Sequence, residues 1–268
     1  IGQAPSRVIE SQTYQQYTKH SHKSQSYMKQ CWISQSLEGL EDDIMRKYNL
    51  TERTDLNEPC GFFGMYRDED LQALIDHKGD CVVVWFGSDA KDLPAVWIAE
   101  LSKHMHIAIS IQVQNSLAKR SIKSFYLPLN ATIAEDWPCT PKGDKIYWYY
   151  NEGCKEFYGS ELIEQIEQRI NIPIIKADYQ TFTRDELYDV YSQCFINLRL
   201  TPHDGCPNTN LQMGLMGRKS IYNGDIPHSI RWEGIDDICE SILNEYKQRH
   251  LSDSVSKDFY NFVKISTK

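Results

Sequence analysis

The sequence predicts an α/β protein made of two Rossmann-like domains with a cleft between them. Short apolar runs alternate with amphipathic stretches along most of the chain, which is typical of parallel sheets covered by helices on both faces. The alternation stops once and then restarts. The interruption contains Pro138, Pro141 and Gly143 and has the composition of an exposed connection. We therefore expect a reduced N-terminal domain over residues 1–137 and a C-terminal domain over residues 144–268.

The first series of elements begins after residue 36, because residues 11–36 are polar, show little periodicity and receive no assignment. The run from Cys81 to Phe86 is apolar throughout, as in a strand buried on both faces. Three acidic residues open the stretch that begins at Asp68, and acidic side chains favour a helix N-terminus. In order, we expect a helix over 37–48, a strand over 59–66, a helix over 68–77, a strand over 81–86, a helix over 95–103, a strand over 106–110, a helix over 113–120 and a strand over 124–128.

The second series repeats this alternation. Ser160 has the character of a helix N-cap, and Gly217 is expected to end a helix. Ligands of such sheets bind at the carboxyl ends of the strands, so the loops that follow the strands are the candidate sites. In order, we expect a strand over 145–150, a helix over 160–170, a strand over 172–177, a helix over 184–192, a strand over 194–201, a helix over 208–216, a strand over 219–222 and a helix over 235–250.

The composition excludes several classes of function. The 268 residues include 29 basic and 37 acidic side chains, and the net charge of -8 has the wrong sign for nucleic-acid binding by the overall field. An anionic substrate therefore needs a local basic pocket. No apolar run approaches the roughly 20 residues that span a bilayer. The eight cysteines form no C-x-x-C pair or zinc-like cluster. We expect a cytoplasmic protein with reduced thiols, no membrane span and no metal.

Arg199 stands out in the predicted strand over 194–201. Its side chain shares one face of that strand with Asn197, inside a sheet expected to be buried on both faces. A guanidinium in low dielectric needs a carboxylate or a phosphate, because an unpaired buried charge is strongly destabilising. Two interpretations stay open. Arg199 either pairs with a carboxylate such as Asp178 or Asp204, or binds an anionic ligand at the end of the strand.

The turn after this strand has the features of an anion site. It spans residues 202–207 and leads into the helix that begins at Asn208. Free backbone N–H groups and the positive end of the helix dipole favour an anion there, and glycine permits close approach. The candidate anion-binding residues are His203, Gly205, Asn208, Thr209 and Asn210.

The segment from Asp204 to Gly217, followed by residues 219–224, resembles the C-terminal-domain motif of group 1, GT-B-fold glycosyltransferases of the family 4 type. Those enzymes show an acidic residue and a glycine, then a proline, then a second acidic residue eight positions after the first, and then a small-residue helix closed by glycine. Here Asp204 takes the first acidic position and Gln212 the second. Gln212 departs from the motif. The resemblance covers about residues 145–250.

The resemblance implies an enzyme that moves a sugar from a nucleoside diphosphate donor to a glycan or other hydroxyl acceptor, without metal or further cofactor. It implies that Asp204 lies near the donor sugar and that Gln212 meets the ribose hydroxyls. Glutamine can hydrogen-bond a diol but cannot carry the charge of an acid. The candidate catalytic residues are Arg199, Asp204 and Asp89. Asp89 follows an apolar strand and could be the general base of an inverting transfer or the N-cap of the next helix.

Further candidate donor contacts lie in loops after the strands. The resemblance implies that Lys155 and Gly153 lie against the diphosphate, and the alternative is a solvated lysine beside Glu152. Tyr179 could stack on the nucleotide base or be an ordinary buried or surface tyrosine. Gly224 lies in a loop that could border the sugar or form an ordinary turn.

Two other functions remain open. The absent second acid motivates a non-catalytic relative that binds a nucleotide or glycan, and a nucleotide-sugar epimerase shares the expected architecture. Asp68-Glu69-Asp70 has the spacing of a metal-binding D-x-D, but its place at the start of a helix favours capping. Binding without turnover would support the non-catalytic relative. Interconversion of the donor without an acceptor would reveal the epimerase.

Overall fold

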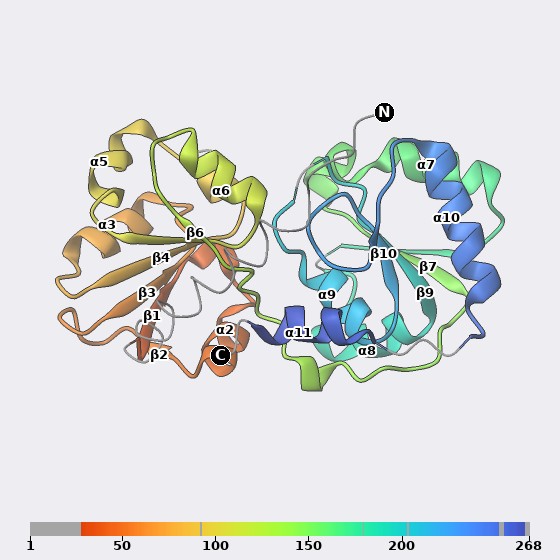
Figure 1. Cartoon of the computed structure of the whole chain (residues 1–268), viewed down its shortest axis with the longest axis horizontal. Helices are drawn as coiled ribbons and strands as arrows, with labels where there is room; N and C mark the ends of the chain where they lie inside the picture. Colours follow the sequence, from red (N-terminus) through yellow and green to blue (C-terminus); the bar gives the residue numbers. More distant parts are fainter. Residues whose placement is uncertain (1–27, 92, 179, 203, 252–254, 266–268) are drawn as a thin grey trace, which may run out of the picture.

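The computed structural model describes residues 28–91, 93–178, 180–202, 204–251 and 255–265. Two parallel β-sheets lie side by side, each packed against helices (Figure 1). This arrangement confirms the predicted α/β fold with two Rossmann-like units. We call the part with the six-stranded sheet the first lobe and the part with the five-stranded sheet the second lobe.

The sheet of the first lobe has the order β2-β1-β3-β4-β5-β6, and all its neighbouring strands are parallel. Every residue of β4 is buried, as its continuous apolar run predicts. Since this sheet has one strand more than the other, the structure does not establish the expected reduction of the N-terminal domain. The strands are β1 (Gln30–Ile33), β2 (Thr51–Glu52), β3 (Cys60–Phe63), β4 (Cys81–Trp85), β5 (Met105–Ala108) and β6 (Phe125–Tyr126).

The sheet of the second lobe has the order β11-β10-β9-β7-β8 and is also parallel throughout. The chain runs from β7 outward to β8 and then returns to the other side of β7 to form β9. Such a reversal of strand order makes a crevice at the carboxyl ends of the two strands beside it, here β7 and β9. The strands are β7 (Lys145–Tyr149), β8 (Ile174–Ala177), β9 (Cys194–Leu198), β10 (Lys219–Ile221) and β11 (Ser229–Ile230).

The α-helices follow most of the strands, and α8 has the predicted bounds. They are α2 (Glu41–Tyr48), α3 (Asp68–Asp76), α4 (Ser88–Lys91), α5 (Ile98–Leu101), α6 (Ile111–Ala118), α7 (Ser160–Arg169), α8 (Arg184–Ser192), α9 (Asn208–Leu215), α10 (Ile235–Gln248) and α11 (Lys257–Ile265). The 3-10 helices are η1 (Gln35–Leu37), η2 (Ala95–Trp97), η3 (Ala134–Asp136) and η4 (Glu152–Tyr158).

Three local predictions need correction. Ser160 opens α7 but does not cap it, because Gly159 occupies the N-cap position with a φ of 81° that suits glycine. The helix expected over 37–48 starts at Glu41. Strand β9 ends at Leu198, so Arg199 lies just beyond the strand and not inside it.

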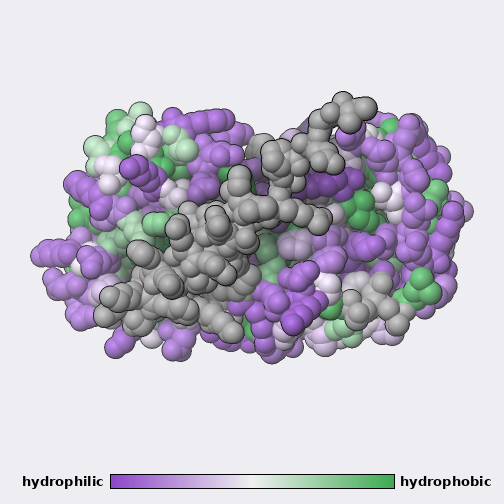
Figure 2. Space-filling view, viewed as in Figure 1, coloured by the Kyte–Doolittle hydropathy of each residue, from purple (hydrophilic) through white to green (hydrophobic). Residues whose placement is uncertain are grey.

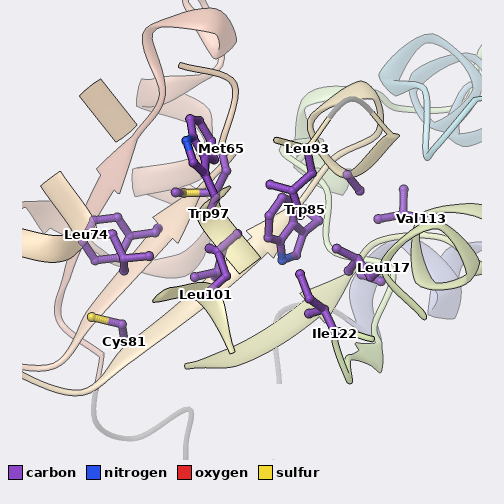
Figure 3. Packing of buried hydrophobic residues seen from close by; sticks show 14 of the residues in the cluster. Met65, Leu74, Cys81, Trp85, Leu93, Trp97, Leu101, Val113, Leu117 and Ile122 are labelled. Atoms are coloured by element: carbon purple, nitrogen blue, oxygen red, sulfur yellow. The ribbon is translucent and has the colours of Figure 1, made fainter. Parts of the chain in front are cut away.

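The core of the first lobe shows how its sheet is covered. Trp85 of β4 is fully buried among side chains from the surrounding helices (Figure 3). Leu101 of α5 and Leu117 of α6 are also fully buried in this cluster. Burial of large apolar side chains at about 25 cal/mol per Å² is the main term that stabilises such a core.

The connection between the sheets is anchored to the second lobe and is not a free linker. Arg218 is only 2% exposed, and its guanidinium donates to the carbonyl oxygens of Thr140 at 2.8 Å and Pro141 at 2.7 Å. The same group donates to the carbonyls of Ser192 and Cys194. The predicted exposed connection is therefore tied down by one buried arginine.

Helix α11 lies across the boundary between the lobes (Figure 1). It packs against α9 of the second lobe, and the carbonyl of Val263 accepts a hydrogen bond from Lys47 of α2 at 3.3 Å. Lys47 also donates to Asn130 Oδ1 and to the Thr132 carbonyl, both at 2.6 Å. Nearby, Arg184 of α8 pairs with Asp43 of α2. Helix α2 of the first lobe is thus bonded to both α8 and α11 of the C-terminal part of the chain.

Lys47 leads to a pH-dependent prediction. Burial lowers the pKa of its ammonium group to about 8, whereas the unfolded chain keeps a pKa near 10.5. Between about pH 8 and 10.5 the folded state binds fewer protons, so its stability should rise with pH in this window. We expect the free energy of unfolding of the unchanged protein, relative to that of Lys47→Met, to increase from pH 8 to 10.5, as measured by urea titration. Parallel pH profiles would contradict this prediction.

The surface is mainly hydrophilic on the outer face of α10, and hydrophobic side chains gather near α5 (Figure 2). Val96, beside α5, is 83% exposed. Within the described residues, no helix is both long enough and apolar enough to cross a membrane.

Candidate functional site

Arg199, the residue singled out by the sequence, lies at the carboxyl ends of β7 and β9, the position where parallel sheets of this topology usually bind ligands. Arg199 is 9% exposed and forms an ion pair with Asp204, in which Nη2 lies 2.5 Å and Nε lies 2.7 Å from Oδ2. The interpretation as an ion pair with Asp204 therefore matches the geometry. Because one guanidinium holds one carboxylate with two donors, the pair is strong and oriented.

Two tyrosine rings enclose the same guanidinium. The Arg199 Cζ atom lies 5.3 Å from the ring centroid of Tyr149, at the end of β7, and 4.8 Å from that of Tyr158, in η4. Burial raises the pKa of both phenols, so they stay neutral. Cation–π contacts of this kind attract the positive charge of the guanidinium and favour one orientation of it.

The turn that carries Asp204 touches the first lobe. The Asp204 N–H donates to Gln112 Oε1 of α6 at 3.1 Å. A Cβ atom placed on Gly205 would lie 2.5 Å from the carbonyl oxygen of Phe86. On the other side, the Tyr222 hydroxyl donates to the Gly205 carbonyl at 3.0 Å. The turn therefore lies where the two lobes meet, and its backbone is hydrogen-bonded by one side chain from each lobe, Gln112 and Tyr222.

Helix α9 places its predicted site residues on different sides. Its N-cap, Pro207, supplies no side-chain cap, and Asn208 Oδ1 accepts a weak bond from the Thr132 hydroxyl at 3.4 Å. Asn210 faces the sheet, is 1% exposed and accepts from Asn197 at 2.7 Å. Gln212 Oε1 accepts from the Tyr191 hydroxyl at 3.3 Å.

Solved structures share this arrangement of the two lobes. Sucrose-phosphate synthase from Thermosynechococcus elongatus matches with a TM-score of 0.57 and 8% identity, over 85% of this chain and 72% of that chain. A TarM mutant from S. aureus, solved with fondaparinux, α-GlcNAc-glycerol and UDP, matches with a TM-score of 0.57 and 8% identity. The match covers 85% of this chain and 56% of the TarM chain. The lipopolysaccharide outer core galactosyltransferase WaaB matches with a TM-score of 0.52 and 11% identity, over 90% of this chain and 97% of that chain.

The chain has the GT-B fold. At 8% to 11% identity these likenesses show the fold alone. The chain spans about half of TarM and nearly three quarters of the synthase. No family model and no curated protein matches the sequence.

Within this GT-B fold, Lys155 lies in η4, which follows β7. Its ammonium group is 2.6 Å from Glu152 and lies over the Tyr150 ring at 5.5 Å, and its side chain is 41% exposed. This geometry favours the alternative of a solvated lysine paired with a neighbouring acid. The Gly153 N–H donates to Asn151 Oδ1 at 2.9 Å, which shapes the start of η4.

Asp89 lies in the first lobe of the GT-B fold, within α4 rather than before it. It is 4% exposed, and its carboxylate accepts hydrogen bonds from the backbone N–H groups of Phe86, Gly87 and Ala90 at 2.7 to 3.1 Å. Burial raises the pKa of the Asp89 carboxyl, and these hydrogen bonds oppose the rise. Asp89 is therefore not the expected N-cap, because it lies in the first turn of α4 and its carboxylate holds the preceding loop.

Four predicted site residues remain, of which two lie outside the described residues and two lie within them. Tyr179 and His203 lie outside the described residues. Gly224 lies in a tightly formed loop, because a Cβ atom there would be 2.0 Å from the Tyr222 ring. Thr209 hydrogen-bonds the Tyr191 side chain.

The acidic D-x-D segment is a helix cap. Asp70 is 1% exposed and accepts hydrogen bonds from Trp32 Nε1 at 3.0 Å and Ser34 Oγ at 2.7 Å, as well as from the backbone at the start of α3. Within the described residues, no group of three or more His, Cys, Asp or Glu side chains is placed to hold a metal ion.

One cavity of about 460 Å³ lies between the lobes, lined by α2, η3 and α8. It contains four aspartates, which include Asp43 and Asp136, against the two arginines Arg46 and Arg184. Its excess of carboxylates opposes binding of a diphosphate. At Arg199, by contrast, one arginine is paired with one aspartate, and the pair carries no such excess of carboxylates.

Sequence reasoning missed Tyr149, Tyr158 and Gln112 as neighbours of the site. Tyr149 ends a predicted strand beside the one that leads to Arg199, and this position is a signal that could have found it. Gln112 is 92 residues from Asp204 in sequence, and no local pattern links the two.

Proposed function

We propose that this protein transfers a sugar from a nucleoside diphosphate donor to a glycan or other hydroxyl acceptor. The observation that carries the proposal is the position of a buried arginine, Arg199, at the carboxyl ends of β7 and β9, beside the turn where the lobes meet. Such crevices are the usual ligand sites of parallel α/β sheets. The GT-B fold supports the same assignment by analogy.

In this proposal the donor's diphosphate takes the place of Asp204 as the partner of Arg199. The ion pair with Asp204 keeps the buried guanidinium neutralised, so on donor binding Arg199 exchanges one anionic partner for another and is not left unpaired. Asp204 is then released toward the sugar. Arg199 and the N–H groups at the start of α9 stabilise the charge that develops on the leaving diphosphate. Asp89 holds its loop and accepts no proton in this scheme.

A second candidate function is nucleotide binding without transfer. It is favoured by Gln212, which stands at the second acidic position and whose amide oxygen already accepts from Tyr191. A neutral amide with one oxygen engaged offers less to a ribose diol than a free carboxylate does.

The test combines calorimetric titration with UDP, GDP and ADP with a donor-hydrolysis assay on the matching sugar nucleotides. The proposal expects at least one nucleoside diphosphate to bind with much higher affinity than its bare nucleoside, and the matching sugar nucleotide to be hydrolysed. Binding with no turnover of any sugar nucleotide would support the second candidate. Failure of all three diphosphates to bind would contradict both.

A further inference from the structure

One contact crosses between the lobes at the proposed donor site itself. Gln112 is the second residue of α6, whose N-terminus is capped by Ser110 through a bond from the Val113 N–H. Its side-chain oxygen accepts the N–H of Asp204 at 3.1 Å. A residue of the first lobe therefore holds the backbone of the residue that neutralises Arg199.

The fit of the turn against the first lobe depends on Gly205. A methyl group there would lie 2.5 Å from the Phe86 carbonyl oxygen and 3.3 Å from Ile109 Cδ1. The Phe86 oxygen belongs to the backbone and cannot move aside like the end of a flexible side chain. Any side chain at position 205 would therefore push the turn away from the first lobe and lengthen the bond to Gln112.

We propose that Gln112 is a positioning residue of the donor site, which holds the Asp204 turn in its binding geometry only while the lobes are in contact at Gly205. This inference rests on the proposed function for the identity of the ligand, a nucleoside diphosphate. Its consequence is that affinity for the diphosphate depends on a side chain that need not touch it. Preorganisation of this kind raises affinity by reducing the cost of ordering the site.

The first test replaces the amide by an apolar side chain of similar length. In Gln112→Met, hydrogen exchange at the Asp204 amide should rise about tenfold, the effect expected for one lost hydrogen bond. Affinity for the nucleoside diphosphate should fall about three- to tenfold by calorimetry, with little change in melting temperature. Gln114→Met is the matched control, because Gln114 lies on the same helix and donates to Ser124 of its own lobe at 2.9 Å.

The second test uses two glycines. Gly205→Ala should increase exchange at Asp204 and weaken diphosphate binding, whereas Gly87→Ala should change neither, since a Cβ atom at Gly87 meets nothing within 4 Å. Unchanged exchange at Asp204 in both Gln112→Met and Gly205→Ala would overturn the inference, and so would equal effects in the control variants. Failure of the unmodified protein to bind a nucleoside diphosphate would instead overturn the proposed function, and the exchange data would still decide the role of Gln112 in holding the turn.

Discussion

Replacing Arg199 with alanine is expected to weaken nucleoside diphosphate binding about 100-fold, the equivalent of about 2.7 kcal/mol for charged hydrogen bonds to phosphate. Affinity for the bare nucleoside should change less than about threefold, because the lost contact is to the phosphates. The guanidinium is already oriented by Tyr149 and Tyr158. Calorimetric titration of both ligands on both proteins measures the difference.

Two controls separate a phosphate contact from a general loss of structure. Removing Arg199 leaves Asp204 without its cation, so Arg199→Ala combined with Asp204→Asn should recover melting temperature without recovering diphosphate affinity. Arg231→Ala removes an arginine whose side chain is 58% exposed and 3.5 Å from Asp225, and it should leave binding unchanged. Equal losses for nucleoside and diphosphate would remove Arg199 from the phosphate role.

The change with the largest expected effect on stability is Arg218→Met. The buried guanidinium donates to backbone carbonyls from the connection, from the ends of α8 and α9, and from the start of β9. Methionine fills much of the same volume but satisfies none of these acceptors. Each buried acceptor left unsatisfied costs about 1–3 kcal/mol, so we expect a loss of about 3 kcal/mol or more in the free energy of unfolding, measured by urea titration.

The matched control is Arg169→Met. Arg169 forms an ion pair with Asp236 at 2.5 Å, and its side chain is 45% exposed. Exposed pairs contribute only about 0.2–1 kcal/mol, so this variant should be nearly as stable as the unchanged protein. If Arg218→Met cost no more than Arg169→Met, the connection between the sheets would not depend on Arg218.

Local sequence patterns predicted much of the fold. Helix α8 begins and ends at the predicted residues, because polar capping residues flank a short periodic segment. The strand Cys81–Trp85 was clear because its whole length is apolar. Strand β1 was not predicted, because it begins with the polar residue Gln30. In the structure Gln30 is buried, and its side-chain amide is hydrogen-bonded to the backbone of Asp55 and Glu58.

The candidate site was predicted only in part. The sequence singled out Arg199 as a charged residue inside a predicted apolar strand, and it left open whether Arg199 pairs with Asp178 or Asp204 or binds an anion. The pairing of Arg199 with Asp204 depends on the conformation of the turn, and at Gly205 that turn lies too close to the Phe86 carbonyl of the first lobe for a side chain to fit. Lys155 looked equally suitable by position, but the local fold of η4 places it beside Glu152.

Alternating apolar strands and amphipathic helices by themselves determined that this protein has two parallel α/β units, because hydrophobic periodicity acts over a few residues and is readable along the chain. The tertiary structure alone decided which side chains surround Arg199 and which lobe holds the Asp204 turn. Those contacts join residues as far apart as Gln112 and Asp204, and their partners are selected by the packing of the two lobes rather than by any local pattern.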